Sequence, residues 1–180
     1  MSETPVPDWA AWRPVERGVL CFIVREREVL LILKKRGLGG GKINAPGGKI
    51  DPGETPLQAA IRETQEEVGL TPHDPVLRGE LYFQFTNGYS LHCLVYRAEG
   101  CSGTPTETDE AVPIWTPRDA IPYEKMWADD ATWLPLLLAG ERFTGHFVFD
   151  DEAMLYHKIE AGRLEPRCFD DAGDNRGAEG

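Results

Sequence analysis

Complete start and stop signals in the sequence predict a helix over Thr55–Val68. Thr55 is a good N-cap, Pro56 fits the first helical position, and Gln58 stands where it completes a capping box. Gly69 supplies the residue that adopts a left-handed conformation at the helix end. Apolar residues recur at helical spacing and predict one buried stripe, made of Leu57, Ala60, Ile61 and Val68. Because such a stripe must pack against another layer, we expect this helix to cover a sheet.

Three glutamates share one face of the same helix. Glu63, Glu66 and Glu67 stand at positions i, i+3 and i+4, which brings their carboxylates together. One interpretation is a solvated acidic face, in which each like-charge pair costs roughly 0.2–0.5 kcal/mol. The other is a site for a hard divalent cation, because such cations prefer oxygen ligands. The spacing alone leaves both interpretations open.

The charge balance argues against one class of partner. The 180-residue chain carries 30 acidic side chains against 19 Lys and Arg, a formal net charge of −11. Nucleic-acid polymers bind to basic surfaces, so we expect none as a partner. No signal peptide or membrane-spanning run is recognisable, and the four cysteines are widely spaced. We therefore expect a cytoplasmic protein with reduced thiols and no membrane partner, and the sequence leaves its oligomeric state open.

Strand patterns surround two helices. Apolar runs at 18–24 and 29–33 predict one hairpin, and runs at 81–85 and 90–96 predict another across Asn87-Gly88. Further strands are expected at 111–115 and 152–160, and a second helix near 131–138. The interleaving predicts an α+β fold with a mixed sheet.

The ends of the chain differ from its centre in composition. A segment rich in Pro and Trp opens the chain, and we expect residues 1–17 to form an N-terminal arm, either loose or packed on the domain or on a partner. Residues 18–162 would form the folded domain. Residues 163–180 are polar and rich in Gly and Asp, which predicts a flexible tail.

The surroundings of the first helix resemble the sequence box of the Nudix hydrolases. Gly48 is followed by five residues, Glu54, seven more residues, and then Arg62-Glu63-Thr64-Gln65-Glu66-Glu67-Val68-Gly69-Leu70. Every fixed position of the box is present, and the one departure is Thr64, where an aliphatic residue is usual. A match at so many positions is far more specific than a short motif. The resemblance implies the family's α/β/α sandwich with a central mixed β-sheet.

The resemblance also implies a cofactor, Mg²⁺ with Mn²⁺ as a substitute, held against a diphosphate. The carboxylates implied as metal ligands and catalytic groups are Glu63, Glu66, Glu67 and Glu110. The implied further ligand is the carbonyl of Gly47, and the implied structural positions are Gly48, Glu54, Arg62 and Gly69. Either Glu66 or Glu110 would accept the proton of the attacking water.

Outside the box, the stretch from Gly18 to Glu160 resembles the animal-type members of this family that hydrolyse oxidised purine nucleoside triphosphates, such as 8-oxo-dGTP. The resemblance implies pyrophosphate release and a role in sanitising the nucleotide pool. The implied contacts to the small-molecule nucleotide are Lys34, Asn44, Phe83, Phe85, Trp127, Asp129, Asp130 and Trp133. Two alternatives remain: a hydrolase of another nucleoside diphosphate derivative such as a sugar nucleotide, and a non-catalytic nucleotide-binding module.

Several implied pocket residues also have structural interpretations. Trp133 and one of the two phenylalanines fit a hydrophobic core, and Asp129-Asp130 fit a helix N-cap and its neighbour. The chain also departs from the subgroup at Val19, Leu38 and Ile43. Such departures imply a purine pocket of altered shape.

Overall fold

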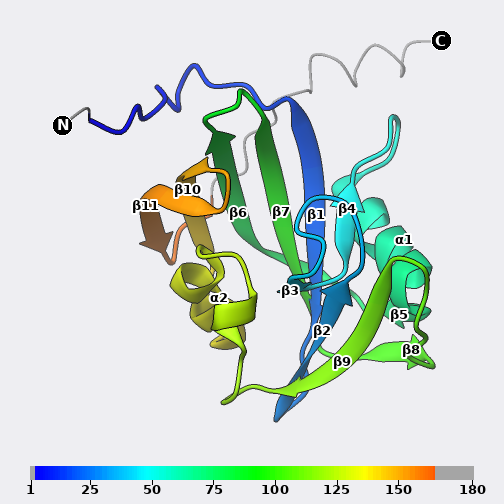
Figure 1. Ribbon diagram of the computed structural model, residues 1–180. Coiled ribbons are helices and arrows are strands. Elements are labelled where there is room, and N and C mark those ends of the chain that lie inside the picture. The colour runs from blue at the N-terminus through cyan, green and yellow to red at the C-terminus, as the bar shows by residue number, and fades with distance from the viewer. Residues whose placement is uncertain (1–2, 165–180) are drawn as a thin grey trace.

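The structure is a computed structural model that describes residues 3–164, so nearly all of the predicted tail lies outside the described residues. A six-stranded sheet in the order β11-β10-β6-β7-β1-β4 forms its centre (Figure 1). The pairs β1–β7 and β10–β6 are parallel and the others antiparallel, so the sheet is mixed, as predicted. Its strands are β1 (Glu16–Ile23), β4 (Gly47–Lys49), β6 (Val76–Phe85), β7 (Ser90–Ala98), β10 (Phe143–Asp150) and β11 (Ala153–Ala161).

Two smaller sheets and two α-helices complete the described fold. The sheets have the orders β3-β2-β9 and β5-β8. Their strands are β2 (Glu28–Lys34), β3 (Ile43–Asn44), β5 (Leu70–Pro72), β8 (Cys101–Gly103) and β9 (Ala111–Pro117). The helices are α1 (Pro56–Val68) and α2 (Asp130–Leu138), with a 3-10 turn at Tyr123–Lys125. Among residues 3–164, neither helix has the length and apolar composition needed to span a bilayer.

The two helices cover opposite faces of the central sheet. Neighbouring residues on a strand point to opposite faces, and Cys21 and Phe22 on β1 do so here. Cys21 packs with Ala59 and Ala60 of α1, whereas Phe22 makes an edge-to-face contact with Trp133 of α2, ring centroids 5.7 Å apart. The layers are therefore helix, sheet and helix, the sandwich that the sequence predicts.

Helix α1 forms as its capping signals predict. The Thr55 hydroxyl accepts a hydrogen bond from the Gln58 backbone N–H, the Gln58 side-chain oxygen accepts one from the Thr55 backbone N–H, and Gly69 ends the helix at φ 72°. The predicted buried stripe is partly wrong, because Leu57 is 40% exposed. The buried residues of α1 are Ala59, Ala60, Thr64, Glu67 and Val68. The small alanines let the helix backbone approach the sheet closely, which leaves Leu57 at the rim.

The predicted hairpin of residues 18–33 is wrong beyond its turn. β1 and β2 share only the bridge between Val24 and Val29, and then they diverge into different sheets. Strand β1 pairs with β7 instead, while β2 pairs with β9. The second predicted hairpin, β6 and β7 across Asn87-Gly88, is confirmed. Strand β10, which the sequence analysis did not assign, lies inside the central sheet beside β6.

The N-terminal arm packs on the sheet rather than extending loosely. Trp12 is buried, its Nε1 donates to Gln84 Oε1 at 2.8 Å, and its ring makes an edge-to-face contact with Tyr82 at 5.5 Å between centroids. Trp9 contacts Trp12 and Tyr82 in the same way. Tyr82 alternates with Phe83 along β6, so the arm covers the face opposite to Phe83.

Candidate functional site

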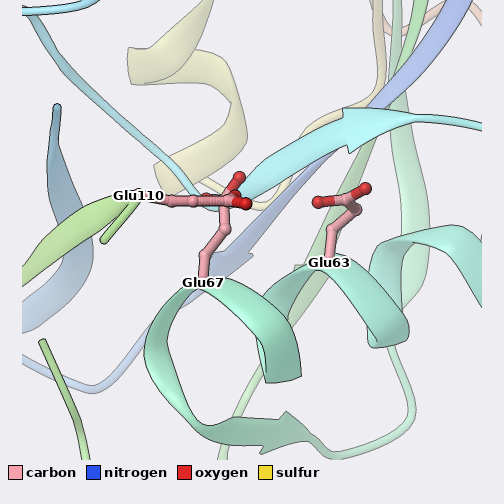
Figure 2. A group of neighbouring side chains, drawn as sticks. All are labelled: Glu63, Glu67 and Glu110. Carbon is pink, nitrogen blue, oxygen red and sulfur yellow. The ribbon is translucent and has the colours of Figure 1, made fainter. Parts of the chain in front are cut away.

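The site is built around a cluster of three carboxylates. Glu63 and Glu67 lie one turn apart on α1, and Glu110 lies immediately before β9 (Figure 2). One carboxylate oxygen from each lies within 4.8 Å of the others. Residues far apart in the sequence are thus brought to one point, as the sequence analysis expects for these three.

Glu110 is held beside α1 by hydrogen bonds of the loop that carries it. The Thr108 hydroxyl donates to the Glu67 carbonyl at 2.8 Å and accepts from the Glu110 backbone N–H at 3.2 Å. The Lys35 backbone N–H donates to the Glu110 carbonyl at 2.9 Å. The C-terminal end of α1 and the start of β9 therefore set the separation of Glu67 and Glu110.

Burial and mutual repulsion both oppose ionisation in this cluster. Burial raises the pKa of Glu67 to about 8, with a further contribution from the negative charge of Glu63. Burial also raises the pKa of Glu63. Glu67 Oε2 is buried and has no hydrogen-bond partner among residues 3–164. A buried carboxylate oxygen of this kind needs a proton or a cation, and clustered oxygens suit a hard divalent cation.

Glu66 lies outside the cluster. Its side chain is about half exposed and pairs with the Arg62 guanidinium at 3.2 Å, one turn earlier on α1. The structure thus brings three of the four predicted glutamates together, and Arg62 borders the cluster, because its Nη1 also donates to Glu63 Oε1 at 2.8 Å.

The loop before α1 is fastened to the helix by the predicted ion pair. Arg62 donates to both carboxylate oxygens of Glu54, at 2.7 and 2.9 Å, and its Nη2 also reaches the Lys49 carbonyl at 3.1 Å. Gly48 passes so close to Glu63 that a Cβ on it would lie 2.5 Å from the Glu63 carboxyl carbon. Only glycine lets the loop and this carboxylate approach each other so closely.

A single cavity of about 750 Å³ joins the carboxylate cluster to a large aromatic pocket. Its lining includes Lys34, Asn44, Gly47, Gly48, Glu63, Phe83, Phe85, Glu67, Glu110, Trp127, Asp129, Asp130 and Trp133. Every residue that the sequence analysis proposes as a substrate contact therefore faces this space. Outside its lining are Glu54, Arg62, Glu66 and Gly69.

The aromatic residues of the pocket also belong to the hydrophobic core. Phe85 stacks on Phe149 with centroids 5.6 Å apart, and Trp127 makes an edge-to-face contact with the same ring. Trp133 is fully buried and stacks on Phe143 at 5.4 Å. The structural and functional interpretations are therefore compatible, since the core itself forms the pocket wall.

Two adjacent buried aspartates form the polar part of this wall. Asp129 Oδ2 accepts a hydrogen bond from Trp133 Nε1 at 2.8 Å, and burial raises the pKa of Asp129 to about 6. Burial and the charge of Asp129 raise the pKa of Asp130 as well. Asp129 stands at the N-cap position of α2 and Asp130 is its first helical residue, although no side-chain hydrogen bond caps this helix. Asp130 Oδ2 is buried and lacks a hydrogen-bond partner within the described chain.

The sequence analysis missed several residues of the cavity wall, among them Leu20, Asn87, Tyr89, Leu91, Cys93 and Asp151. Tyr89 and Leu91 follow the β6–β7 turn, where alternation along β7 directs them to the side of Phe83. The register of these residues with β6 could therefore have identified both of them as part of the cavity wall. No comparable signal marks Asp151, which enters through the turn after β10.

Comparison with known proteins identifies relatives over most of the chain. The family model described as "NUDIX domain" matches residues 14–137. The oxidized purine nucleoside triphosphate hydrolase of Danio rerio is 43% identical over 143 residues, covering 78% of this chain and 92% of the relative. The Mus musculus protein of the same name is 40% identical over 134 residues, covering 74% and 86%. The crystal structure of the MutT protein from Bacillus halodurans superposes with a TM-score of 0.74 at 27% identity, covering 81% and 98%.

Proposed function

Because this chain belongs to the Nudix hydrolase family, we propose that it converts oxidised purine nucleoside triphosphates to nucleoside monophosphates and pyrophosphate, with Mg²⁺ as cofactor. The relatives that share about two fifths of its sequence bear names for this activity. Free, buried thiols such as Cys21 and Cys93 suit the reducing cytoplasm in which such an enzyme would sanitise the nucleotide pool.

The observation that carries the proposal is the shared cavity. A nucleoside triphosphate has a flat aromatic base at one end and a polyanion at the other, so its site must offer two kinds of surface. Here Phe83 and Trp127 line the same space as Glu63 and Glu67. A metal centre with an aromatic pocket beside it fits such a substrate, whereas a bare acidic patch does not.

The residues present fit a divalent cation. Three carboxylate oxygens already lie within 4.8 Å of one another, and the unpartnered Glu67 Oε2 is among the buried oxygens of the group. We propose that Glu63, Glu67 and Glu110 hold the cation together with the Gly47 carbonyl. Glu66 lies outside the cavity lining and would join this set only through a change of its side-chain conformation. When bound, the cation would neutralise phosphate charge and lower the pKa of a bound water.

The chain itself must then position the phosphate groups and accept a proton. The Lys34 ammonium lines the cavity and supplies positive charge near Glu67, where it would contact the phosphate chain. Water attacks phosphorus, the bridging P–O bond between the α and β phosphates breaks, and pyrophosphate leaves. Glu110 is our proposed proton acceptor because it faces the cavity, whereas Glu66 is outside its lining.

Base recognition would use the aromatic wall and the aspartate pair. A purine stacks well on tryptophan or phenylalanine. Asn44 Oδ1 accepts from the Ala45 backbone N–H at 2.8 Å, which leaves the amide nitrogen to donate to the base. One protonated and one ionised aspartate together offer a donor and an acceptor, which suits the altered edge of an oxidised purine.

The proposal is tested by pyrophosphate release, with Mg²⁺, from five substrates in parallel: 8-oxo-dGTP, 2-hydroxy-dATP, dGTP, dATP and an ADP-sugar. We expect kcat/KM for the oxidised purines to exceed that for dGTP and dATP by roughly tenfold or more. If the ADP-sugar or an unmodified dNTP were favoured, the substrate assignment would be wrong, although the assignment as a Nudix hydrolase would still hold. Nucleotide binding without any product would instead indicate a non-catalytic module.

A further inference from the structure

Lys42 lies behind the aromatic wall of the cavity. It directly precedes β3, at the end of the glycine-rich loop that follows β2. Its Nζ lies 5.3 Å from the centroid of the Trp127 ring, a cation–π distance. Only 21% of its side chain is exposed. Partial burial strengthens such an interaction, because the ammonium has lost part of its hydration.

The loop that carries Lys42 has a defined backbone. The Gly41 N–H donates to the Lys34 carbonyl at 2.7 Å, and the Lys42 N–H donates to the Gly39 carbonyl at 2.9 Å. A Cβ on Gly39 would lie 2.7 Å from Trp127 Nε1, so this backbone touches the edge of the indole. Loop and ammonium therefore contact the same ring.

The ammonium acts on the pocket without lining it. Trp127, Asp129 and Asp130 face the cavity, whereas Lys42 is outside its lining. The positive charge of Lys42 nevertheless favours the ionised form of Asp130 and lowers its pKa, against the larger effect of burial. Lys42 therefore acts on both parts of the wall that would contact a base, the Trp127 ring and the Asp130 carboxyl.

A second interaction orients Lys42 from outside. Its Nζ lies 3.3 Å from Glu152 Oε1 in the turn between β10 and β11. The Glu152 side chain is 64% exposed, so solvent weakens this pair. The contact with Trp127 is therefore the more consequential of the two.

We propose that Lys42 is a positioning residue for purine binding, which holds the Trp127 ring through its ammonium and so sets the affinity of the pocket for a stacked base. This inference rests on the proposed function for the choice of ligand. It assigns to Lys42 no contact with substrate and no part in the chemistry.

The test measures binding and turnover separately in Lys42→Met, Lys42→Arg and Glu152→Gln. Binding of 8-oxo-dGMP is measured by calorimetry in EDTA, and KM and kcat are measured with 8-oxo-dGTP and Mg²⁺. For Lys42→Met we expect Kd and KM to rise on the order of 3–10-fold, with kcat within about twofold. Lys42→Arg should bind like wild type because a guanidinium also supplies a cation to the ring. Glu152→Gln should change Kd by less than about twofold.

The outcomes separate this inference from the proposed function. A Lys42→Met protein whose Kd stays within twofold of wild type would overturn the inference, and so would a Lys42→Arg protein as weak as the Met variant. A fall in kcat with Kd unchanged would equally contradict it, because a positioning role in binding predicts the reverse. If wild type prefers another substrate, the proposed function fails and the Kd values for 8-oxo-dGMP decide the inference alone. Absence of 8-oxo-dGMP binding by wild type would overturn the inference, whereas pyrophosphate release from the substrate panel decides the proposed function.

Discussion

Arg62 holds Glu54 through two parallel hydrogen bonds, with Nε 2.7 Å from Oε2 and Nη2 2.9 Å from Oε1. This fork joins the loop that follows β4 (Gly47–Lys49) to the helix that contains Glu63 and Glu67. The geometry of the carboxylate cluster therefore depends on a pair that lies outside the cavity.

The Arg62→Lys variant should lose this connection, because an ammonium cannot form the fork. We expect a loss of about 1 kcal/mol in the free energy of unfolding and a fall of roughly tenfold in kcat.

The hydrogen bonds from Arg62 lower the pKa of Glu54 from 4.5. The stabilisation is therefore present above pH 4.5 and is lost as the pH falls through the lowered value. Thermal melts between pH 7 and pH 3 should show a difference between variant and wild type that is largest at pH 7 and shrinks as the pH falls. The exposed Arg27→Lys variant is the matched control, and equal melts for both variants at pH 7 would contradict the assignment.

Mg²⁺ should stabilise the folded protein through the carboxylate cluster. At ten times its dissociation constant, a bound cation adds about 1.4 kcal/mol, which corresponds to a rise in Tm of roughly 3–6 °C. The Glu67→Gln variant should show no such rise, because the amide removes the central anionic ligand. Glu107→Gln is the matched control, since Glu107 is exposed and pairs with Lys35 outside the cluster. A Mg²⁺-dependent rise that persists in Glu67→Gln would place the cation elsewhere.

Asp129 should make stability fall with rising pH. Its pKa is raised by burial from 3.8 to about 6, so the folded protein retains a proton that the unfolded chain has released. Stability is therefore lost between about pH 4 and pH 6. The Asp129→Asn variant escapes this loss and keeps an oxygen for Trp133 Nε1. Its Tm should exceed that of wild type by several degrees at pH 7 and match it near pH 4, while KM for 8-oxo-dGTP rises. A Tm difference that is the same at both pH values would refute the assignment.

The N-terminal arm should contribute to stability but little to catalysis. Trp12→Ala removes a buried ring and the hydrogen bond to Gln84, so we expect a loss of about 3 kcal/mol. Its contacts lie on the face of β6 opposite to Phe83, so kcat per folded molecule should stay within about twofold of wild type. Denaturant unfolding measures the loss of stability, and the activity of the folded fraction measures the effect on catalysis. The exposed Val6→Ala variant is the control. An intact unfolding midpoint would show that the arm is dispensable.

Local signals made the helices and the box predictable from the sequence. The capping of α1 depends on residues within one turn of Thr55 and Gly69, so the sequence contains everything needed to place it. The juxtaposition of Glu63 with Glu67 follows from the helical repeat alone. Glu110 required the family resemblance, because 43 residues separate it from Glu67 and no local pattern brings the two together.

Features that depend on long-range pairing were not predictable. β1 and β2 have the pattern of a hairpin, but β1 gains more by pairing in parallel with β7 along its whole length. Strand β10 carries large aromatic residues on one face and pairs in parallel with β6, with Phe143 opposite Gly79 and Phe149 opposite Phe85, a separation of 64 positions in the sequence. The contact between Lys42 and Trp127 likewise joins segments that lie far apart in the sequence and share no local pattern. Each of these three contacts can be placed only when the order of strands in the sheet is known, and a single sequence does not specify that order.

Product analysis tests the central claim most directly. Purified protein is incubated with Mg²⁺ and 8-oxo-dGTP, and the nucleotide products and inorganic products of wild type and Glu67→Gln are quantified over time. Our account predicts equal amounts of 8-oxo-dGMP and pyrophosphate from wild type, and a rate at least about a hundredfold lower from Glu67→Gln. Release of 8-oxo-dGDP and phosphate, or equal rates from the two proteins, would contradict it.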